Sequence, residues 1–313
     1  MTRLLSFFCA LFFISSVYSA SPAPAYGDDY MVVTAQKLAT NIGNDILRQG
    51  GNAVDAAVAI GYALAVVHPC CGNIGGGGFM LIRKKDGTTV FLNFREKAPL
   101  AVKESFYVDD SFKKTPYLLV AVPGTVLGLN TALKKYGRLP LKTIIQPAID
   151  LANNGFAVSR YGARLLGYFE SSLLAQPNVA AIFAPSGEII QPEQILKQPE
   201  LARSLTAIAN EGSDAFYRGS IAKQLVQASQ QNNGLITEKD LASYSVQELT
   251  PITCNYRGYD IITAPPPSAG GVTICQVLNI TEQYPLSEMG FHSAKATHIT
   301  IEAMRQAFKD RSQ

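Results

Sequence analysis

An arginine and a glutamate, Arg95 and Glu96, follow an apolar run and stand just before Ala98-Pro99, where the chain must turn. A guanidinium held at the end of a strand is well placed to bind a carboxylate through two parallel N–H···O bonds. The sequence therefore contains a candidate carboxylate-binding arginine. A salt bridge from Arg95 to Glu96, or to another carboxylate, is the structural alternative.

Four consecutive glycines, Gly75–Gly78, precede this pair along the chain. Glycine permits positive φ and close approach of two backbones, at an entropic cost that a plain surface loop has little reason to carry. The run is not a phosphate-binding Walker motif, because no Gly-Lys-Ser/Thr follows it, and residues 72–75 do not form the GxGxxG dinucleotide fingerprint.

The elements that must position these residues lie on both sides of the glycines. A helix is predicted over residues 53–67, with Asn52 as its cap and Asp55 in its first turn. Its other side chains are small or apolar, so we expect it to be buried, and Pro69 ends it. Two apolar, β-branched runs, residues 79–83 and 88–94, follow; Asp-Gly lies between them and predicts a hairpin that carries Arg95 at its far end.

These motifs resemble those of the γ-glutamyltransferases, also called glutathione hydrolases. The resemblance extends from about Met31 to the last residues and follows the family order. It rests on residues 50–59 (GGNAVDAAVA), 68–80 (HP, then GNIGGGGFM), 94–99 (FREKAP), 122–124 (VPG), 235–237 (LIT) with Asp240, Leu241 and Tyr244, and 265–271 (PPPSAGG).

The resemblance implies an α+β fold, the αββα sandwich of the N-terminal nucleophile hydrolases. Family members are precursors that cut themselves before a threonine, which then attacks the γ-glutamyl amide. No Thr-Thr-His sequence occurs in this chain, and Thr88-Thr89 is its only threonine pair. We therefore expect the large-subunit portion, ending before the catalytic threonine, with an incomplete sandwich and no catalytic residue of its own.

By the same resemblance, Arg95 binds the α-carboxylate of the glutamyl group, and Glu96 orients or balances it. The family implies no cofactor and no metal. Its partners are glutathione or other γ-glutamyl compounds, and a small subunit that contains the threonine if that subunit is separately encoded.

Residues 1–19 are predicted to be a secretory signal, with one basic residue, Arg3, an apolar run and a cut after Ser19. A membrane anchor is the alternative, although the run is shorter than a span needs. Residues 20–313 would then form one large-subunit-like domain in the periplasm or outside the cell. The net charge of +3 points neither to nucleic acid nor, after signal removal, to a membrane surface.

The cysteines beyond the signal are Cys70, Cys71, Cys254 and Cys275. Export permits disulfides, but the pairing stays open, a vicinal bridge would be strained, and the spacing fits no zinc pattern. Buried thiols are therefore the favoured interpretation over a functional pair. His68 is expected to be a helix-end residue rather than a base, and His292 and His298 are expected to face solvent.

The rest of the chain has a mostly helical pattern, with short strands between Ser245 and Ala264. No linker or repeat divides it. The helices are predicted over residues 125–136, 140–154, 159–176, 198–210, 219–232, 270–283 and 293–310.

The sequence thus predicts the large-subunit portion of an exported γ-glutamyltransferase, inactive by itself. Three alternatives remain at this point. They are a split enzyme that pairs with a separate small subunit, an inactive fragment, and a non-catalytic protein that keeps Arg95 to bind γ-glutamyl ligands.

Overall fold

The computed structural model describes residues 23–103, 105 and 116–312. The chain divides into two units, residues 1–33 and residues 34–313. The described part of the first unit forms no helix or strand, and the predicted signal, residues 1–19, lies outside the described residues. Everything below concerns the second unit.

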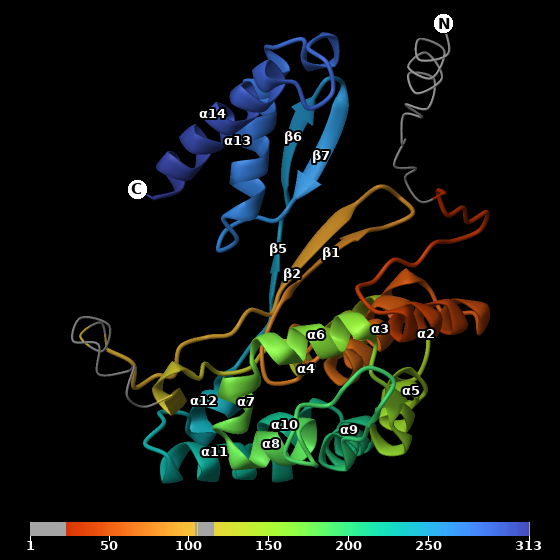
Figure 1. Ribbon diagram of the computed structural model, residues 1–313, viewed down its shortest axis with the longest axis vertical. Helices are drawn as coiled ribbons and strands as arrows, with labels where there is room; N and C mark the ends of the chain where they lie inside the picture. The colour runs from red at the N-terminus through yellow and green to blue at the C-terminus, as the bar shows by residue number, and fades with distance from the viewer. Residues whose placement is uncertain (1–22, 104, 106–115, 313) are drawn as a thin grey trace, which may run out of the picture. The chain divides into compact units, whose positions relative to one another are not determined.

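A buried helix, α3 (Ala53–Val67), organises the core as the sequence predicts (Figure 1). Asn52 accepts hydrogen bonds from the backbone N–H groups of Val54 and Asp55, and the Asp55 carboxylate accepts from the Asn52 N–H, which completes a capping box. The helices packed against α3 are α2 (Lys37–Arg48), α4 (Thr125–Tyr136) and α5 (Leu141–Asn154).

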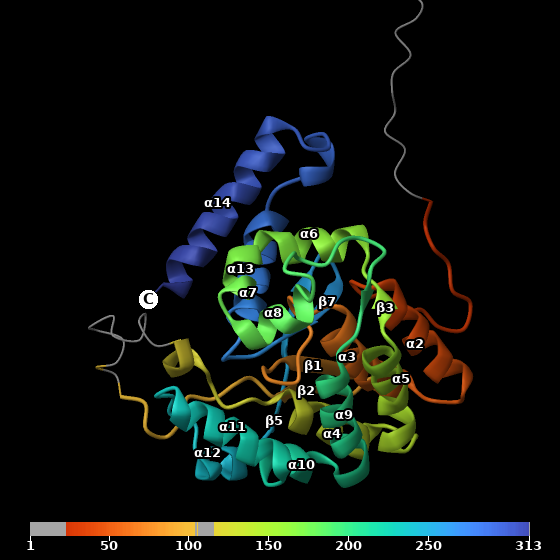
Figure 2. The ribbon, with the colours of Figure 1, turned by 60° about the horizontal axis from the view of Figure 1, so that its bottom comes forward.

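Further helices continue this packing. In Figure 2, α9 (Pro199–Glu211) lies beside α5, in agreement with the contacts between these two helices. Other helices before residue 250 are η3 (Pro116–Leu119), α10 (Ser213–Tyr217), α11 (Ser220–Gln231) and α12 (Glu238–Ser243). The sequence did not predict α2, α10 or α12.

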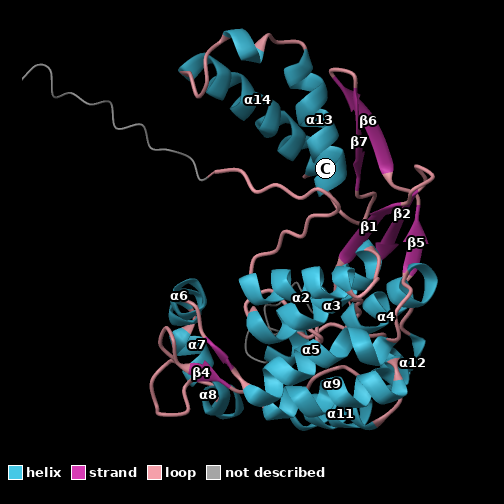
Figure 3. Cartoon of the chain, turned by 90° about the vertical axis from the view of Figure 1, so that its right-hand side faces the viewer, coloured by secondary structure: helices cyan, strands magenta, loops and turns pink. Residues whose placement is uncertain are grey.

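The predicted hairpin is present as β1 (Phe79–Arg83) and β2 (Thr89–Asn93), antiparallel with Leu81 opposite Phe91. Its turn contains Gly87 at φ +84°, the left-handed conformation that favours glycine. A third strand, β5 (Gln247–Leu249), pairs with β2 and completes the sheet (Figure 3). The sheet therefore joins residues far apart in the sequence.

The single helix predicted over residues 159–176 is wrong. The chain instead forms α6 (Arg160–Tyr168), α7 (Glu170–Leu174) and α8 (Pro177–Phe183). Phe169 leaves helical geometry between the first two, and Gln176 is extended because it precedes Pro177, which begins α8. A short two-stranded sheet, β3 (Phe156–Ala157) with β4 (Ile195–Leu196), flanks this region in sequence.

The last part of the chain has its own strands and helices. β6 (Ile252–Tyr256) and β7 (Tyr259–Thr263) form a hairpin that contacts α13 (Gly270–Glu282), and α13 packs on α14 (Ala294–Arg311). A short helix, η4 (Leu286–Glu288), separates the two. A disulfide between Cys254 and Cys275 joins β6 to α13. The main hydrophobic cluster of the described chain contains no residue after Val246.

The α+β class is confirmed. Within the described chain the strands form one sheet of three and two sheets of two, so the four-layer sandwich stays a prediction. Among the described helices, none is both long and apolar enough to cross a bilayer.

Candidate functional site

The glycine loop meets the end of β2. Phe94, directly after the strand, exchanges two backbone hydrogen bonds with Gly78. A Cβ atom at Gly77 would lie 2.6 Å from both the Phe94 carbonyl oxygen and the Glu96 nitrogen. Only glycine allows this approach, because real side chains do not come so close to backbone atoms. The glycines therefore let the loop lie directly against the segment that carries Arg95.

The Val-Pro-Gly segment, residues 122–124, packs onto the same loop. The N–H groups of Gly124 and Thr125 both donate to the Gly76 carbonyl, at 2.7 and 3.0 Å. The Asn73 side chain joins the two segments, since its Oδ1 accepts from the Gly76 N–H and from the Thr125 hydroxyl. The loop, the start of α4 and the end of β2 thus form one hydrogen-bonded cluster.

Tyr244 holds Arg95 from the other side. Its hydroxyl donates to the Arg95 carbonyl at 2.8 Å. Burial, with a smaller contribution from the charge of Glu96, raises the pKa of Tyr244, so the hydroxyl keeps its proton and remains a donor. Lys97 lies over the Tyr244 ring and donates to the Ser245 carbonyl. The segment beyond the strand is therefore held at Phe94, Arg95 and Lys97.

Asp240 fixes the next part of the chain. Its carboxylate caps α12 by accepting from the Thr237 N–H and hydroxyl, and it also accepts from the Leu100 N–H at 2.7 Å. Burial alone would raise the pKa of Asp240, but these hydrogen bonds outweigh it and the pKa is lowered. Asp240 thus ties the chain after Pro99 to α12.

The Arg95 side chain is exposed at this cluster. Its backbone N–H donates to Asn93 Oδ1, but the guanidinium forms no salt bridge with any residue that the structure describes. The ion pair with Glu96 that the sequence offered as an alternative is therefore not formed. A backbone held by hydrogen bonds thus presents to solvent a planar cation that pairs with none of the described carboxylates, which is an arrangement suited to a carboxylate ligand.

One predicted landmark is not part of this cluster. No hydrogen bond within the described chain joins residues 265–271 to the Arg95 segment. Residues 266–269 instead line a separate hollow with Ala307, Asp310 and Arg311. The sequence did not single out the roles of Asn73 and of the Tyr244 hydroxyl. These contacts join residues far apart in sequence, and periodicity carries no signal for them.

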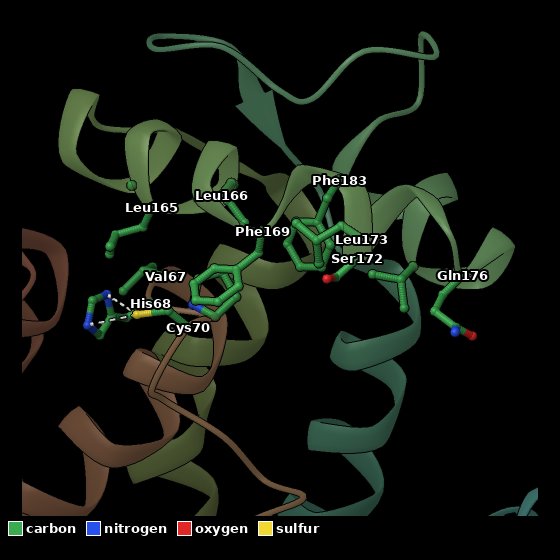
Figure 4. Close-up of a pocket in the computed structure, with 13 residues that line it drawn as sticks. Val67, His68, Cys70, Leu165, Leu166, Phe169, Ser172, Leu173, Gln176 and Phe183 are labelled. Carbon is green, nitrogen blue, oxygen red and sulfur yellow. Dashed lines mark hydrogen bonds between the residues drawn. The ribbon is translucent and has the colours of Figure 1, made fainter. Parts of the chain in front are cut away.

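The histidines behave as predicted. His68 is buried at the end of α3, where its backbone N–H donates to the Leu64 carbonyl. His292 and His298 are exposed. The His68 ring borders a mainly apolar cavity of about 420 Å³ formed with α6, α7 and α8, seen in Figure 4. Burial lowers the pKa of His68, so its imidazole is neutral at neutral pH.

The favoured interpretation of four buried thiols is wrong. Cys254 and Cys275 form a disulfide, and Cys70 and Cys71 are free and exposed. Although Cys70 is exposed, partial desolvation of its sulfur raises the pKa of the thiol to about 11, and the neighbouring Cys71 thiol adds to this effect. With His68 this pair is a group of side chains that could hold a metal ion.

Comparison with known proteins defines the class. The family model for gamma-glutamyltranspeptidase matches residues 39–313, and the chain belongs to this family. In structure it is similar to Helicobacter pylori gamma-glutamyltranspeptidase, with a TM-score of 0.89 and 41% identity over 93% of this chain and 85% of that chain.

Among sequence relatives, a glutathione hydrolase proenzyme of Pseudomonas sp. (strain A14) is 48% identical over 97% of this chain and 54% of its own length. The corresponding proenzyme of Escherichia coli (strain K12) is 48% identical over 93% of this chain and 51% of its own length. The chain thus spans about half the length of these curated relatives and corresponds to their large-subunit-like portion.

Proposed function

We propose that this chain is the large-subunit portion of an exported γ-glutamyltransferase or glutathione hydrolase, and that it positions γ-glutamyl substrates such as glutathione. The observation that carries the proposal is the exposed Arg95 guanidinium, which forms no salt bridge with a described residue, on a backbone held by the glycine loop and the Tyr244 hydroxyl. A planar fork at a fixed position favours bidentate binding of the glutamyl α-carboxylate.

In this proposal the nucleophile is a threonine at a Thr-Thr-His-like cleavage sequence, and no such sequence occurs in residues 1–313. The threonine hydroxyl would attack the γ-glutamyl amide, and the resulting acyl-enzyme would pass its glutamyl group to water or to an acceptor amine. This chain contributes the Arg95 contact and part of the scaffold. The αββα sandwich would be completed by strands of the small subunit.

The test is a comparison of two strand-end arginines in the chain co-expressed with a small subunit that contains the threonine. Arg95→Lys keeps the positive charge but loses the fork. We therefore expect kcat/KM for a γ-glutamyl anilide to fall roughly 10–150-fold, which corresponds to about 1.5–3 kcal/mol, the range for hydrogen bonds to charged groups. Arg83→Lys is the matched control, because Arg83 is also exposed at the end of a strand, β1. Unchanged KM and kcat in Arg95→Lys would remove Arg95 from the site.

A measurement of glutathione binding to the chain alone separates the other two alternatives, the non-catalytic ligand-binding protein and the inactive fragment. A non-catalytic ligand-binding protein would bind glutathione by itself and lose that binding in Arg95→Lys. An inactive fragment would neither bind glutathione nor gain activity from a small subunit.

Export to the periplasm or outside the cell belongs to the same proposal, with residues 1–19 as the signal and residues 20–313 as the domain. The disulfide between Cys254 and Cys275 supports it, because such bonds persist mainly in oxidising compartments. Amino-terminal sequencing of exported protein should begin near Ala20. A cytosolic product that starts at Met1 would contradict export.

A further inference from the structure

The turn that follows α3, residues 68–72, brings two thiols and an imidazole together. The His68 carbonyl accepts hydrogen bonds from the N–H groups of Cys71 and Gly72, at 3.0 and 2.8 Å. A Cβ atom at Gly72 would lie 2.0 Å from the Leu64 carbonyl oxygen. The absence of a side chain at Gly72 therefore lets the turn fold back against the end of the helix, which fixes the backbone of residues 68–72 relative to α3.

The donor atoms of His68, Cys70 and Cys71 all lie within 4.8 Å of one another. The Cys70 sulfur is 3.4 Å from His68 Nε2 and 2.6 Å from the Cys71 sulfur. Figure 4 shows the His68 ring and the Cys70 side chain pointing toward one another. His68 is 7% exposed, whereas both cysteines are exposed. The group thus has a fixed, buried nitrogen on one side and two accessible sulfurs on the other.

We propose that His68, Cys70 and Cys71 bind one Cu(I) ion through two thiolates and one imidazole. Thiolates select soft cations, and the group contains no carboxylate oxygen that would suit Mg²⁺ or Ca²⁺. Structural zinc sites are almost always four-coordinate, but this part of the described chain supplies three donors. Binding releases the two thiol protons to solvent and changes no oxidation state.

The sulfurs must separate for this to occur. With metal–sulfur bonds of about 2.3 Å, two ligand sulfurs at a trigonal or tetrahedral angle stand roughly 3.8–4.0 Å apart. Because Cys70 and Cys71 are both exposed, rotation about their Cα–Cβ bonds can open the pair without moving the core. The Cys70 sulfur is 3.4 Å from His68 Nε2 and 3.7 Å from Nδ1, so it lies beside the ring and not along the Nε2 lone pair. Metal binding therefore also requires rotation of the Cys70 side chain or of the ring.

Gln36 supports the nitrogen donor. Its side-chain amide lies 3.5 Å from His68 Nδ1, the ring nitrogen farther from Cys70. A half-turn of this amide lets its oxygen accept from the Nδ1–H group, and the Nε2 lone pair is then available on the side of the thiols. A hydrogen-bonded amide in this place fixes both the tautomer and the ring orientation. Gln36 is thus a positioning residue for the site.

The experiment is a titration of the reduced, anaerobic full-length protein with Cu(I) in competition with the chromogenic chelator bicinchoninate. We expect one Cu(I) per chain, and loss of this uptake in Cys70→Ser and in Cys71→Ser. His68→Gln and Gln36→Ala should each weaken binding by roughly 10–100-fold, the second through loss of the supporting hydrogen bond. His298→Gln is the matched control, since His298 is exposed on α14, and it should bind Cu(I) like the parent.

Three results would overturn the proposal: uptake that both cysteine variants retain, an uptake of Zn(II) without any of Cu(I), or a Cys70–Cys71 disulfide that persists after reduction. Selective alkylation of Cys70 and Cys71, the two free thiols of the described residues, in the folded protein gives a second test that needs no variant. The alkylated protein should bind no Cu(I), while its circular dichroism stays unchanged. The inference does not depend on the proposed function, because its readout is metal binding rather than γ-glutamyl transfer.

Discussion

At the scale of single residues, the cluster around Arg95 depends on a glycine with no room for a side chain. A Cβ atom at Gly124 would lie 2.0 Å from the Phe94 carbonyl oxygen and 2.1 Å from the Tyr244 hydroxyl. The first is a backbone atom next to Arg95, and the second is the donor that holds the Arg95 carbonyl. Even one methyl group must therefore displace the segment that carries the guanidinium.

We predict that Gly124→Ala lowers the free energy of unfolding by about 1–3 kcal/mol, the usual cost of overpacking, and also weakens binding of γ-glutamyl ligands. Gly167→Ala is the matched control. Gly167 lies in α6 with no atom within 4 Å of an added Cβ, so alanine should be neutral or slightly stabilising in a helix. Urea unfolding of the two variants measures the difference. Equal effects would show that the close approach at Gly124 has no energetic importance.

Much of the local structure could be predicted at the scale of elements. The capped helix Ala53–Val67, the Asp-Gly hairpin and the helix Thr125–Tyr136 have caps, turns or periodicity within a few residues. The helix over residues 159–176 was wrong because its periodicity continues through a break at Phe169 and because Pro177 begins a new helix. The pairing of β5 with β2 was not predictable, since its partners are far apart in sequence.

The candidate site likewise combines a residue that the local sequence predicts with contacts that it does not. Arg95 was singled out from its type and its place after a strand, and its side chain is exposed and forms no salt bridge with a described residue. The hydrogen bonds that hold it, from Tyr244 and through Asn73, depend on tertiary packing that no local pattern encodes. The exposure of Cys70 was also missed, because cysteine is usually buried and only the turn after α3 places it in solvent.

The α12 helix provides a pH-dependent contact. The pKa of Asp240 is lowered in the folded protein, so its stabilising effect is fully present above the ordinary aspartate pKa of about 3.9 and is lost as the pH falls through the lower, folded value. At pH 7 we expect Asp240→Asn to lower the free energy of unfolding by about 1–3 kcal/mol, as for a carboxylate that accepts several hydrogen bonds.

Unfolding measured at pH 7, 5 and 3 checks this prediction. The difference between the parent and Asp240→Asn should be the same at pH 7 and 5 and should shrink at pH 3, where the parent begins to lose its charged acceptor. Glu238→Gln is the matched control, because Glu238 is exposed in the same first turn, and it should change stability little at any of these values. A difference that grows as the pH falls would contradict the sign.

At the scale of the whole molecule, the two parts of residues 34–312 are stabilised differently. The part before Val246 has a continuous core that includes Tyr62, Leu92 and Ile144. The part after it has few buried apolar residues, with Cys275, Ala303 and Ala307 among them, and contains the Cys254–Cys275 disulfide. Its large exposed apolar residues are Tyr259, Val272, Ile274, Tyr284, Phe291, Ile301, Met304 and Phe308. Single exposed apolar residues are ordinary, but under the proposed function we expect a small subunit to cover many of these.

We therefore predict that residues 20–313, expressed without a small subunit, are prone to aggregation or partly molten, and release no product from a γ-glutamyl anilide. At roughly 25 cal/mol per Å², several hundred Å² of uncovered apolar surface amounts to about 5–10 kcal/mol, comparable with the whole stability of a typical domain. Light scattering, dye binding to exposed apolar surface and amide hydrogen exchange of residues 251–312 measure the first claim, and co-expression with a threonine-containing small subunit should reverse all three signals. A soluble monomer with a sharp, cooperative melt would refute the structural claim. Turnover by the purified chain alone would refute the catalytic one, since the proposed nucleophile belongs to the partner.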